Sequence, residues 1–166
     1  MITVTHRRYV PYAHAHYAGN LVDGAYSLGL FGDVATELCI RTDGDEGLFA
    51  SYSDVQFRGP VRAGDVLEVT AEVVRVGSRS RTLEFRAVVV GRGRPDVSAS
   101  AAAMLDEPVV ATTATGVVVV PEPGHAAAWT SARDGSLLDG TRRACRWVVV
   151  GVNRPLTSRL TQRRRS

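Results

Sequence analysis

Apolar residues recur with helical spacing along one stretch of the chain, residues 21–41. The stretch contains no proline, and its apolar positions repeat every three or four residues. They form two neighbouring stripes, the first with Leu21, Ala25, Leu28, Gly32, Ala35 and Cys39 and the second with Leu30, Phe31, Val34 and Leu38. We expect Asn20 to be the N-cap, with Asp23 in the position of a capping box. A helix that is apolar on most sides must be covered by other structure.

Alternating apolar and polar residues, which indicate strands with one buried face, lie before and after this helix. The predicted strands are residues 2–10, 48–57, 66–76, 82–90 and 109–120. Turns rich in glycine, proline or charged residues separate them, at residues 42–47, 58–65 and 77–81. We interpret residues 92–108, which are rich in small side chains, as a linker. Residues 14–20 are interpreted as a loop that carries two histidines.

This order of elements predicts an α+β fold, in which a curved antiparallel sheet wraps around one long central helix. The inner face of such a sheet and the helix bury each other. The architecture is known as the hotdog fold. We expect residues 1–121 to form this domain. Residues 122–166 are a C-terminal extension of undefined fold, with a run at 144–152 compatible with a further strand and then a basic tail. Free sheet edges favour dimers.

The composition excludes several classes of function. All 20 basic residues are arginines, so Schiff-base chemistry, pyridoxal phosphate attachment and a P-loop are excluded. The net charge of +3 is mild, and the basic tail lacks interleaved aromatic residues, so we expect no nucleic-acid partner. No apolar run reaches the ~18 residues of a membrane span, and no signal peptide is evident. We therefore expect a cytoplasmic protein with no membrane contact, in which Cys39 and Cys145 are reduced thiols.

Three acidic residues interrupt the apolar helix. At about 100° per residue, Asp23, Asp33 and Glu37 fall, together with Tyr26, within an arc of roughly 80°. Buried unpaired carboxylates are costly, so two interpretations remain. The acids either form a solvated edge, with Glu37 paired to Arg41 four residues later, or bind a ligand. The stretch also contains three glycines, Gly24, Gly29 and Gly32. Because glycine disfavours helix, we expect a sheet or a ligand to approach the helix backbone closely.

Five segments together resemble the hotdog-fold CoA ammonia-lyases, which act on β-alanyl-CoA and 3-aminobutyryl-CoA. The segments are AHAHYAGNLVDGA, FGDVATEL, DGDEGLF, F-x-x-PVRAGD and VGSRSRTLEF. The resemblance covers residues 7–120, and its last two segments are shared with hotdog acyl-CoA thioesterases. It implies reversible addition or elimination of ammonia across the α,β-bond of an acyl-CoA. It also implies an active site at a subunit interface beside the long helix, in a dimer or a hexamer built from dimers. The alanine-rich residues 92–107 and the segment beyond Pro121 depart from the family.

Elimination of ammonia requires a base for the α-proton, a group that holds the enolate oxygen and a group that binds the ammonium. Our hypothesis assigns proton transfer to Glu37 and ammonium binding to Asp33, because neighbouring carboxylates push their pKa values apart. Asp23 is either a third acid or only a helix cap. The N–H groups at the helix start would hold the thioester oxygen, near Gly19, Asn20 and Gly24.

The remaining candidates concern substrate binding. His14 and His16 lack a third metal ligand, so we expect no metal, and no cofactor other than the CoA of the substrate. His16 either orients a carboxylate or contacts substrate, or is a plain core histidine. Tyr17 and Tyr26 are either pocket wall or core. Arginines in turns are weak candidates for the CoA phosphates: Arg58, Arg62, Arg75, Arg79 and Arg81.

Three other functions fit the same pattern. A hotdog acyl-CoA or acyl-carrier thioesterase uses a helix carboxylate to activate water, and an enoyl-thioester hydratase acts on the same double bond without ammonia. A non-catalytic acyl-binding module is the third. We favour the lyase because the line of acids suits a cationic amine.

Overall fold

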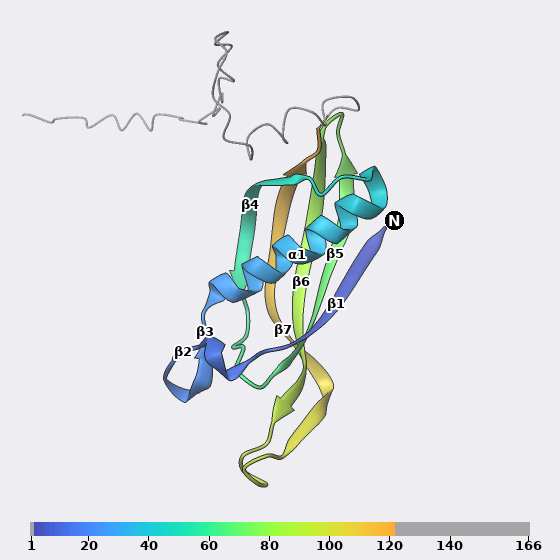
Figure 1. Ribbon diagram of the computed structural model, residues 1–166. Coiled ribbons are helices and arrows are strands. Elements are labelled where there is room, and N and C mark those ends of the chain that lie inside the picture. The colour runs from blue at the N-terminus through green and yellow to red at the C-terminus, as the bar shows by residue number, and fades with distance from the viewer. Residues whose placement is uncertain (1, 122–166) are drawn as a thin grey trace, which may run out of the picture. The chain divides into compact units, whose positions relative to one another are not determined.

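The computed structural model describes residues 2–121 (Figure 1). Strand β1 (Thr3–Tyr9) precedes a segment with two short 3-10 turns, Tyr12–His14 and Ala18–Asn20, and two short strands, β2 (Ala15–Tyr17) and β3 (Leu21–Val22). Helix α1 (Gly24–Asp43) follows. Four long strands complete the domain: β4 (Leu48–Phe57), β5 (Val66–Val76), β6 (Ser80–Gly93) and β7 (Ala102–Val119). The predicted extension at 122–166, including the run at 144–152 and Cys145, lies outside the described residues.

The five long strands form one antiparallel sheet in the order β1-β5-β6-β7-β4. Helix α1 crosses one face of this sheet, as Figure 1 shows. The predicted α+β architecture, a curved sheet around one long helix, is therefore confirmed. Strands β1 and β4 are the two edges of the sheet, and β4 pairs with β7 alone within the described chain.

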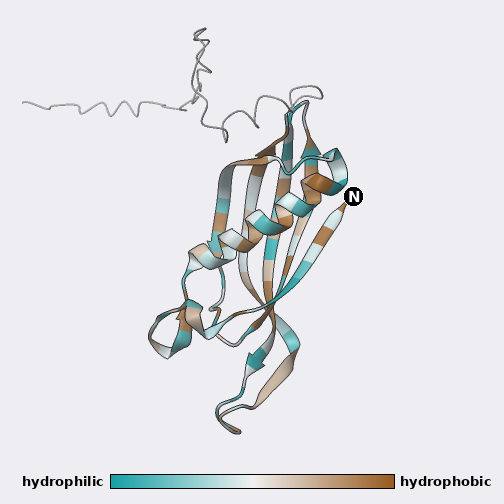
Figure 2. Ribbon diagram, viewed as in Figure 1, coloured by the Kyte–Doolittle hydropathy of each residue, from teal (hydrophilic) through white to brown (hydrophobic). Residues whose placement is uncertain are grey.

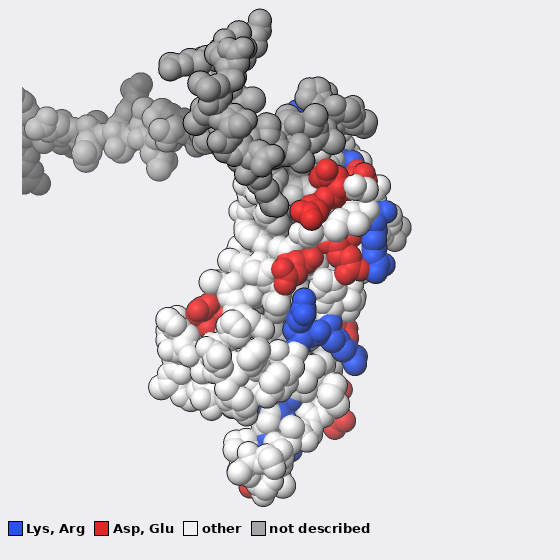
Figure 3. Space-filling view, viewed as in Figure 1, with Lys and Arg blue, Asp and Glu red and all other residues white. Residues whose placement is uncertain are grey.

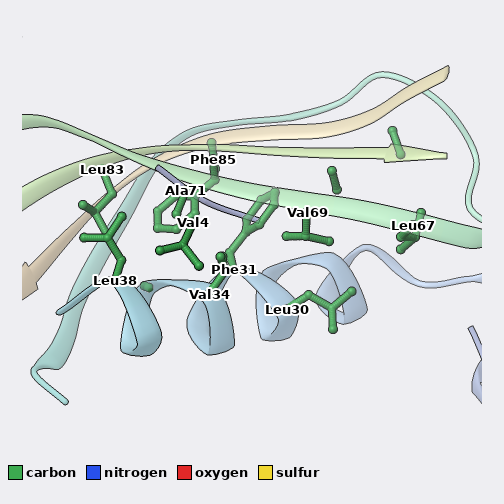
Figure 4. Packing of buried hydrophobic residues seen from close by; sticks show 14 of the residues in the cluster. Val4, Leu30, Phe31, Val34, Leu38, Leu67, Val69, Ala71, Leu83 and Phe85 are labelled. Carbon is green, nitrogen blue, oxygen red and sulfur yellow. The ribbon is translucent and has the colours of Figure 1, made fainter. Parts of the chain in front are cut away.

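The core lies between α1 and the sheet (Figure 4). The helix buries one face, which consists of Ser27, Leu30, Phe31, Val34, Ala35, Leu38 and Cys39. Alternate residues of the strands meet it, among them Leu67, Val69 and Ala71 on β5 and Leu83, Phe85, Ala87 and Val89 on β6. The rings of Phe31 and Phe85 stack with centroids 5.0 Å apart. Figure 2 shows the alternation of hydrophobic and hydrophilic residues along the strands on which this packing depends.

The helix begins three residues later than the sequence indicated. Asp23, not Asn20, is the N-cap, and its side chain accepts a hydrogen bond of 3.1 Å from the Tyr26 N–H. Asn20 has a φ of 60° and lies in the turn before the cap. The apolar residues at 21 and 22 instead form β3, which pairs antiparallel with β2, and Val22 N–H also donates to Val61 O at 3.0 Å. Tertiary pairing therefore overrides a pattern that also fits a helix. The helix ends at Gly44, whose φ is 67°.

The predicted linker at 92–108 is wrong over most of its length. Strands β6 and β7 continue through it, with Gly91 opposite Met104 and Gly93 opposite Ala102. Only the residues between the two strands form the connection. The register shifts between Val89 and Gly91, and Pro108 lies in the part of β7 where the pairing is interrupted. A proline at such a point costs no ladder hydrogen bond, which explains how it fits within a strand.

Candidate active site

Two predicted acids of α1 lie against residues of the edge strand β1. His6 Nε2 is hydrogen-bonded to Glu37 Oε2, and Arg41 is paired with Glu37 Oε1. Arg8 Nη2 lies 3.8 Å from Asp33 Oδ2. Figure 3 shows acidic and basic side chains side by side on the face of the molecule that carries α1. The structure therefore brings Asp33 and Glu37 together and adds two β1 residues to them.

The spacing of residues along β1 and α1 explains why His6 meets Glu37 while Arg8 meets Asp33. Residues two apart on a strand point the same way and are separated by about 6.6 Å. Residues four apart on a helix lie one above the other, about 6 Å apart along the axis. His6 and Arg8 thus meet Glu37 and Asp33 respectively. Val4, the preceding residue on the same side of β1, is buried in the core and fixes the strand against the helix.

The two carboxylates differ in exposure and in their partners. The Asp33 side chain is 57% exposed and has one distant cation, whereas that of Glu37 is 35% exposed and has both oxygens engaged. The hydrogen bond from His6, with a further contribution from Arg41, holds the pKa of Glu37 below its ordinary value. Glu37 is therefore ionised at neutral pH. The Arg41 pair expected for a solvated edge is present, and both acids face solvent in the single chain.

Asp23 is not part of this acid pair. It caps the helix, and its other carboxylate oxygen lies 4.0 Å from His16 Nδ1. Asp23 shares the angular sector of Asp33 and Glu37 but not their height along the helix. At 1.5 Å per residue, the N–H of Gly24 is about 13 Å from the level of Asp33 and about 20 Å from that of Glu37. One small acyl group therefore cannot contact both Glu37 and the start of the same helix.

The loop before the helix carries the predicted substrate-binding residues on its exposed surface. Residues 11–20 are all exposed, so His14 and His16 are not core histidines and Tyr17 is not a core residue. The His14 ring contacts that of Tyr26, with centroids 4.6 Å apart, and the His16 ring meets Tyr17 edge-on at 4.5 Å. Burial raises the pKa of Tyr26, which is only half-buried and lies beside Arg8 and Asp33.

Backbone conformation and a neighbouring loop hold the helix start in place. Gly19 has a φ of 73°, next to the left-handed Asn20. Asn20 O accepts a hydrogen bond of 2.8 Å from Ala63 N–H. The Phe57 ring also packs directly on the backbone of Gly24, since a Cβ placed there would clash with Phe57 Cε1. The predicted close approach is therefore found at Gly24, whereas Gly29 and Gly32 have nothing within 4 Å of such a Cβ.

The buried carboxylate of Asp65 organises that loop. Its Oδ2 accepts hydrogen bonds from Arg62 N–H at 2.8 Å and from Arg92 Nη2 at 2.7 Å, and its Oδ1 accepts one from Arg92 Nε at 2.9 Å. Asp65 is fully buried. The conspicuous segment PVRAGD thus has a structural role, because it holds residues 61–63 where they pair with the chain entering α1.

The candidate CoA-binding arginines do not gather in one place. Arg58 donates to Thr113 Oγ1 at 3.2 Å and lines an open groove of about 500 Å³, together with residues such as Thr70, Glu72 and Arg86 from the sheet face opposite α1. Exposed Arg62 pairs with Leu21 near the helix start. The other three lie at the opposite end of β5, which at 11 residues is about 36 Å long: Arg75, Arg79 and Arg81. The five arginines therefore do not form one cationic cluster on the single chain.

Two further expectations from the sequence are that the protein has no metal site and no membrane span. Residues 2–121 contain no group of three or more histidine, cysteine, aspartate or glutamate side chains arranged to hold a metal ion. Within the same residues, no helix has the length and apolar character needed to cross a bilayer.

The site residues that the sequence did not reveal are His6 and Arg8. Their alternation on a predicted strand is a signal that they share one face. Nothing in the sequence indicates that this face meets Asp33 and Glu37.

Comparison with known proteins agrees with the fold. Residues 19–94 match the model of the thioesterase superfamily. The solved structure of a hexameric hotdog-fold thioesterase from Campylobacter jejuni has a TM-score of 0.59, with 19% identity over 70% of this chain and 80% of that chain. That likeness concerns the fold alone. The fold is therefore the hotdog fold.

Two relatives are much more similar in sequence. The chain is 51% identical to a 3-aminobutyryl-CoA ammonia lyase of Acetoanaerobium sticklandii over 108 residues, which are 65% of this chain and 86% of the relative. It is 36% identical to the solved beta-alanyl-CoA:ammonia lyase from Clostridium propionicum, with a TM-score of 0.68 over 72% of this chain and 85% of that chain. The chain belongs to the family of hotdog-fold CoA ammonia-lyases.

Proposed function

We propose that this protein is a carbon–nitrogen lyase that adds or eliminates ammonia across the α,β-bond of a short β-aminoacyl-CoA. The substrate pair is 3-aminobutyryl-CoA and crotonyl-CoA, or β-alanyl-CoA and acryloyl-CoA. The observation that carries the proposal is the 51% identity to a 3-aminobutyryl-CoA ammonia lyase over most of that relative. The adjacent carboxylates of Asp33 and Glu37 supply chemistry suited to a cationic substrate.

The reaction assigns a separate role to each acid. Glu37, ionised at neutral pH, takes the α-proton that the thioester makes acidic. The electron pair of that C–H bond forms the double bond, and the Cβ–N bond breaks with its electron pair on nitrogen. The protonated amino group thereby departs as ammonia. Asp33, whose carboxylate is open to solvent, binds the ammonium before it leaves. In the direction of addition the same groups act in reverse.

The thioester oxygen needs hydrogen-bond donors close to Glu37. The donors at the start of the same helix are too far from Glu37 for one substrate to contact both. The start of α1, near Gly19, Asn20 and Gly24, is about 20 Å away along the axis. We therefore place these donors on a second protomer, so that one active site uses the acids of one helix and the N-terminus of another. His14, His16 and Tyr17 belong to the same loop and line the acyl or pantetheine part of the substrate.

The assembly and the remaining partners are proposals of the same kind. Free strand edges support a dimer that continues the sheet, with a hexamer of three dimers as the larger form. The hexameric state stated for the Campylobacter jejuni thioesterase is consistent with this assembly. Arg62, next to the helix start, is the arginine best placed for a CoA phosphate. We propose no cofactor beyond the CoA of the substrate, no nucleic-acid partner and a cytoplasmic location.

The test is to incubate the protein with crotonyl-CoA or acryloyl-CoA, with and without ammonia, and to follow the ultraviolet absorbance of the conjugated double bond and the release of free thiol. Ammonia-dependent loss of absorbance without thiol release supports the lyase. Thiol release identifies a thioesterase, and ammonia-independent loss of absorbance identifies a hydratase. If no thioester is turned over but CoA binds, the protein is an acyl-binding module.

Variants test the two carboxylates separately. Glu37→Gln is expected to abolish turnover without unfolding the protein, and Asp33→Asn is expected to raise the KM for ammonia more than it lowers kcat. Glu46→Gln, an exposed acid in the turn after α1, is the matched control and should leave both constants unchanged. An active Glu37→Gln enzyme would exclude Glu37 as the proton-transfer group.

A further inference from the structure

Glu37 has two partners, His6 and Arg41, and the His6 side chain is held more firmly than that of Arg41. His6 lies opposite Val69 in the β1–β5 pairing, two residues from buried Val4, and its side chain is 21% exposed. Arg41 belongs to the same helix as Glu37, has a long side chain and is 61% exposed. The imidazole is therefore a donor on a fixed strand, whereas the guanidinium is free to move into solvent.

We propose that His6 is a positioning residue for Glu37, which holds one carboxylate oxygen so that the other points at the substrate α-carbon. The inference rests on the proposed function. Glu37 Oε2 stays bonded to His6, while Arg41 leaves Oε1 when substrate arrives. Oε1 is then the atom that receives the α-proton. Orientation of this kind matters because a displacement of about 1 Å at a reacting group can cost on the order of 100-fold in rate.

The charged groups around Glu37 are consistent with this assignment. On its own helix these are Arg41 and, one turn earlier, Asp33; on β1 they are His6 and Arg8. The residues of β5 that face α1 are apolar and do not titrate: Leu67, Val69 and Ala71. Among these groups, His6 is the one that combines a direct hydrogen bond to Glu37 with a backbone fixed in the sheet. The same hydrogen bond is the main cause that keeps the pKa of Glu37 low.

A purely structural role for the pair predicts a different result. If the His6–Glu37 contact only ties β1 to α1, its loss lowers stability and leaves the rate constant of the folded enzyme unchanged. Loss of the donor moves the titration of Glu37 to higher pH under either role, but only if His6 positions the base does its loss also lower kcat of the folded enzyme. The two roles are therefore separated by measurements on folded protein.

Two His6 variants make this separation. His6→Phe keeps a ring of similar size but has no donor, whereas His6→Gln carries an amide N–H₂ that can take the place of Nε2 and does not titrate. Thr5→Val, at an exposed position one residue earlier on β1, is the control. Circular dichroism and thermal unfolding establish that each variant is folded. The kinetic readouts are kcat, KM for crotonyl-CoA and the acid limb of the pH–rate profile.

We expect His6→Phe to lower kcat by about 10- to 100-fold, with KM changed less than about threefold, and to move the acid limb to higher pH. His6→Gln should recover most of kcat, and Thr5→Val should resemble the unmodified protein. A folded His6→Phe enzyme with unchanged kcat, or a His6→Gln enzyme as slow as His6→Phe, overturns the proposal.

A second measurement does not depend on turnover. With carbon-13 in the glutamate carboxyl groups, the Glu37 signal, assigned with Glu37→Gln, is followed against pH by NMR. Its midpoint should rise in His6→Phe and rise less in His6→Gln. An unchanged midpoint overturns the positioning role even if the protein proves not to be a lyase. A raised midpoint in an enzyme without lyase activity would instead contradict the proposed function alone.

Discussion

The ring of Phe85 covers the backbone of Gly116, so that a Cβ on Gly116 would lie 2.8 Å from Phe85 Cε2. The Phe49 ring closes the same space from β4, at 2.6 Å from such a Cβ. Phe85 is almost fully buried and stacks on Phe31 of the helix. The absence of a side chain near the C-terminal end of β7 therefore allows the aromatic cluster to fill the space between sheet and helix.

Gly116→Ala is therefore expected to destabilise the protein by about 1–3 kcal/mol, as overpacking of a dense core does. Gly29→Ala is the matched comparison, because Gly29 lies on the exposed side of α1 with nothing within 4 Å of the added methyl. Alanine favours helix over glycine, so this variant should be stabilised by up to about 1 kcal/mol. Urea unfolding at one protein concentration measures both, and equal effects of the same sign would contradict this account.

The ion pair of Asp65 and Arg92 gives a second prediction. Removal of Arg92 leaves a fully buried carboxylate without two of its donors, so Arg92→Met should destabilise the protein by roughly 3–5 kcal/mol. Thermal unfolding is the measurement. Arg94→Met is the control, since Arg94 makes a similar pair with Asp96 at the surface and its loss should change the midpoint little. Equal shifts for the two variants would argue against a structural role for PVRAGD.

The sequence predicted the fold well because burial alternates regularly along the strands. The boundaries of β4 and β5 agree with the predicted residues 48–57 and 66–76, since turns rich in glycine flank both. The start of α1 was wrong because the apolar pair at 21–22 fits either helix or strand. Its pairing with β2 and with Val61 decides between them, and those contacts are not visible in a sequence.

The candidate site was predicted in part for a related reason. Helical periodicity gives the angle of each residue, which brought Asp33 and Glu37 together correctly. It takes no account of distance along the helix axis, so it grouped Asp23 with them although Asp23 lies about 20 Å from Glu37 along that axis. Nor does it give the register between β1 and α1, which decides that His6 meets Glu37. Contacts of this kind depend on how two elements pack, so they require the structure.

The buried thiol of Cys39 gives a third prediction. Burial raises its pKa to about 11, so at pH 8 only about one thiol in a thousand is ionised. In a Cys145→Ser background, the native protein should react with a thiol reagent at pH 8 far more slowly than the urea-unfolded protein. Because the thiolate is the reactive form, the native rate should rise about tenfold per pH unit up to pH 10. Fast, stoichiometric labelling of the native protein would contradict the observed burial.

The last prediction concerns pH and the pair of Asp43 with Arg81, which joins the end of α1 to the start of β6. Burial opposes ionisation of Asp43, but hydrogen bonds from Arg81 and Thr42 outweigh it and hold the pKa of this carboxyl below its ordinary value. A carboxyl with a lowered folded-state pKa stabilises the protein above its unfolded-state pKa, and this stabilisation is lost as the pH falls through the folded-state pKa. Thermal stability should therefore decrease below about pH 4.

Arg81→Met tests the contribution of this pair to that decrease. The variant should unfold at a lower temperature than the unmodified protein at pH 7, and the difference should shrink at pH 3, where protonation of Asp43 already weakens the pair. Arg79→Met, an exposed arginine of the same turn, is the control and should shift the midpoint little at either pH. A difference for Arg81→Met that is as large at pH 3 as at pH 7 would mean that the arginine acts through its hydrogen bonds to Gly77 O and Ser80 O, both 3.0 Å, and not through Asp43.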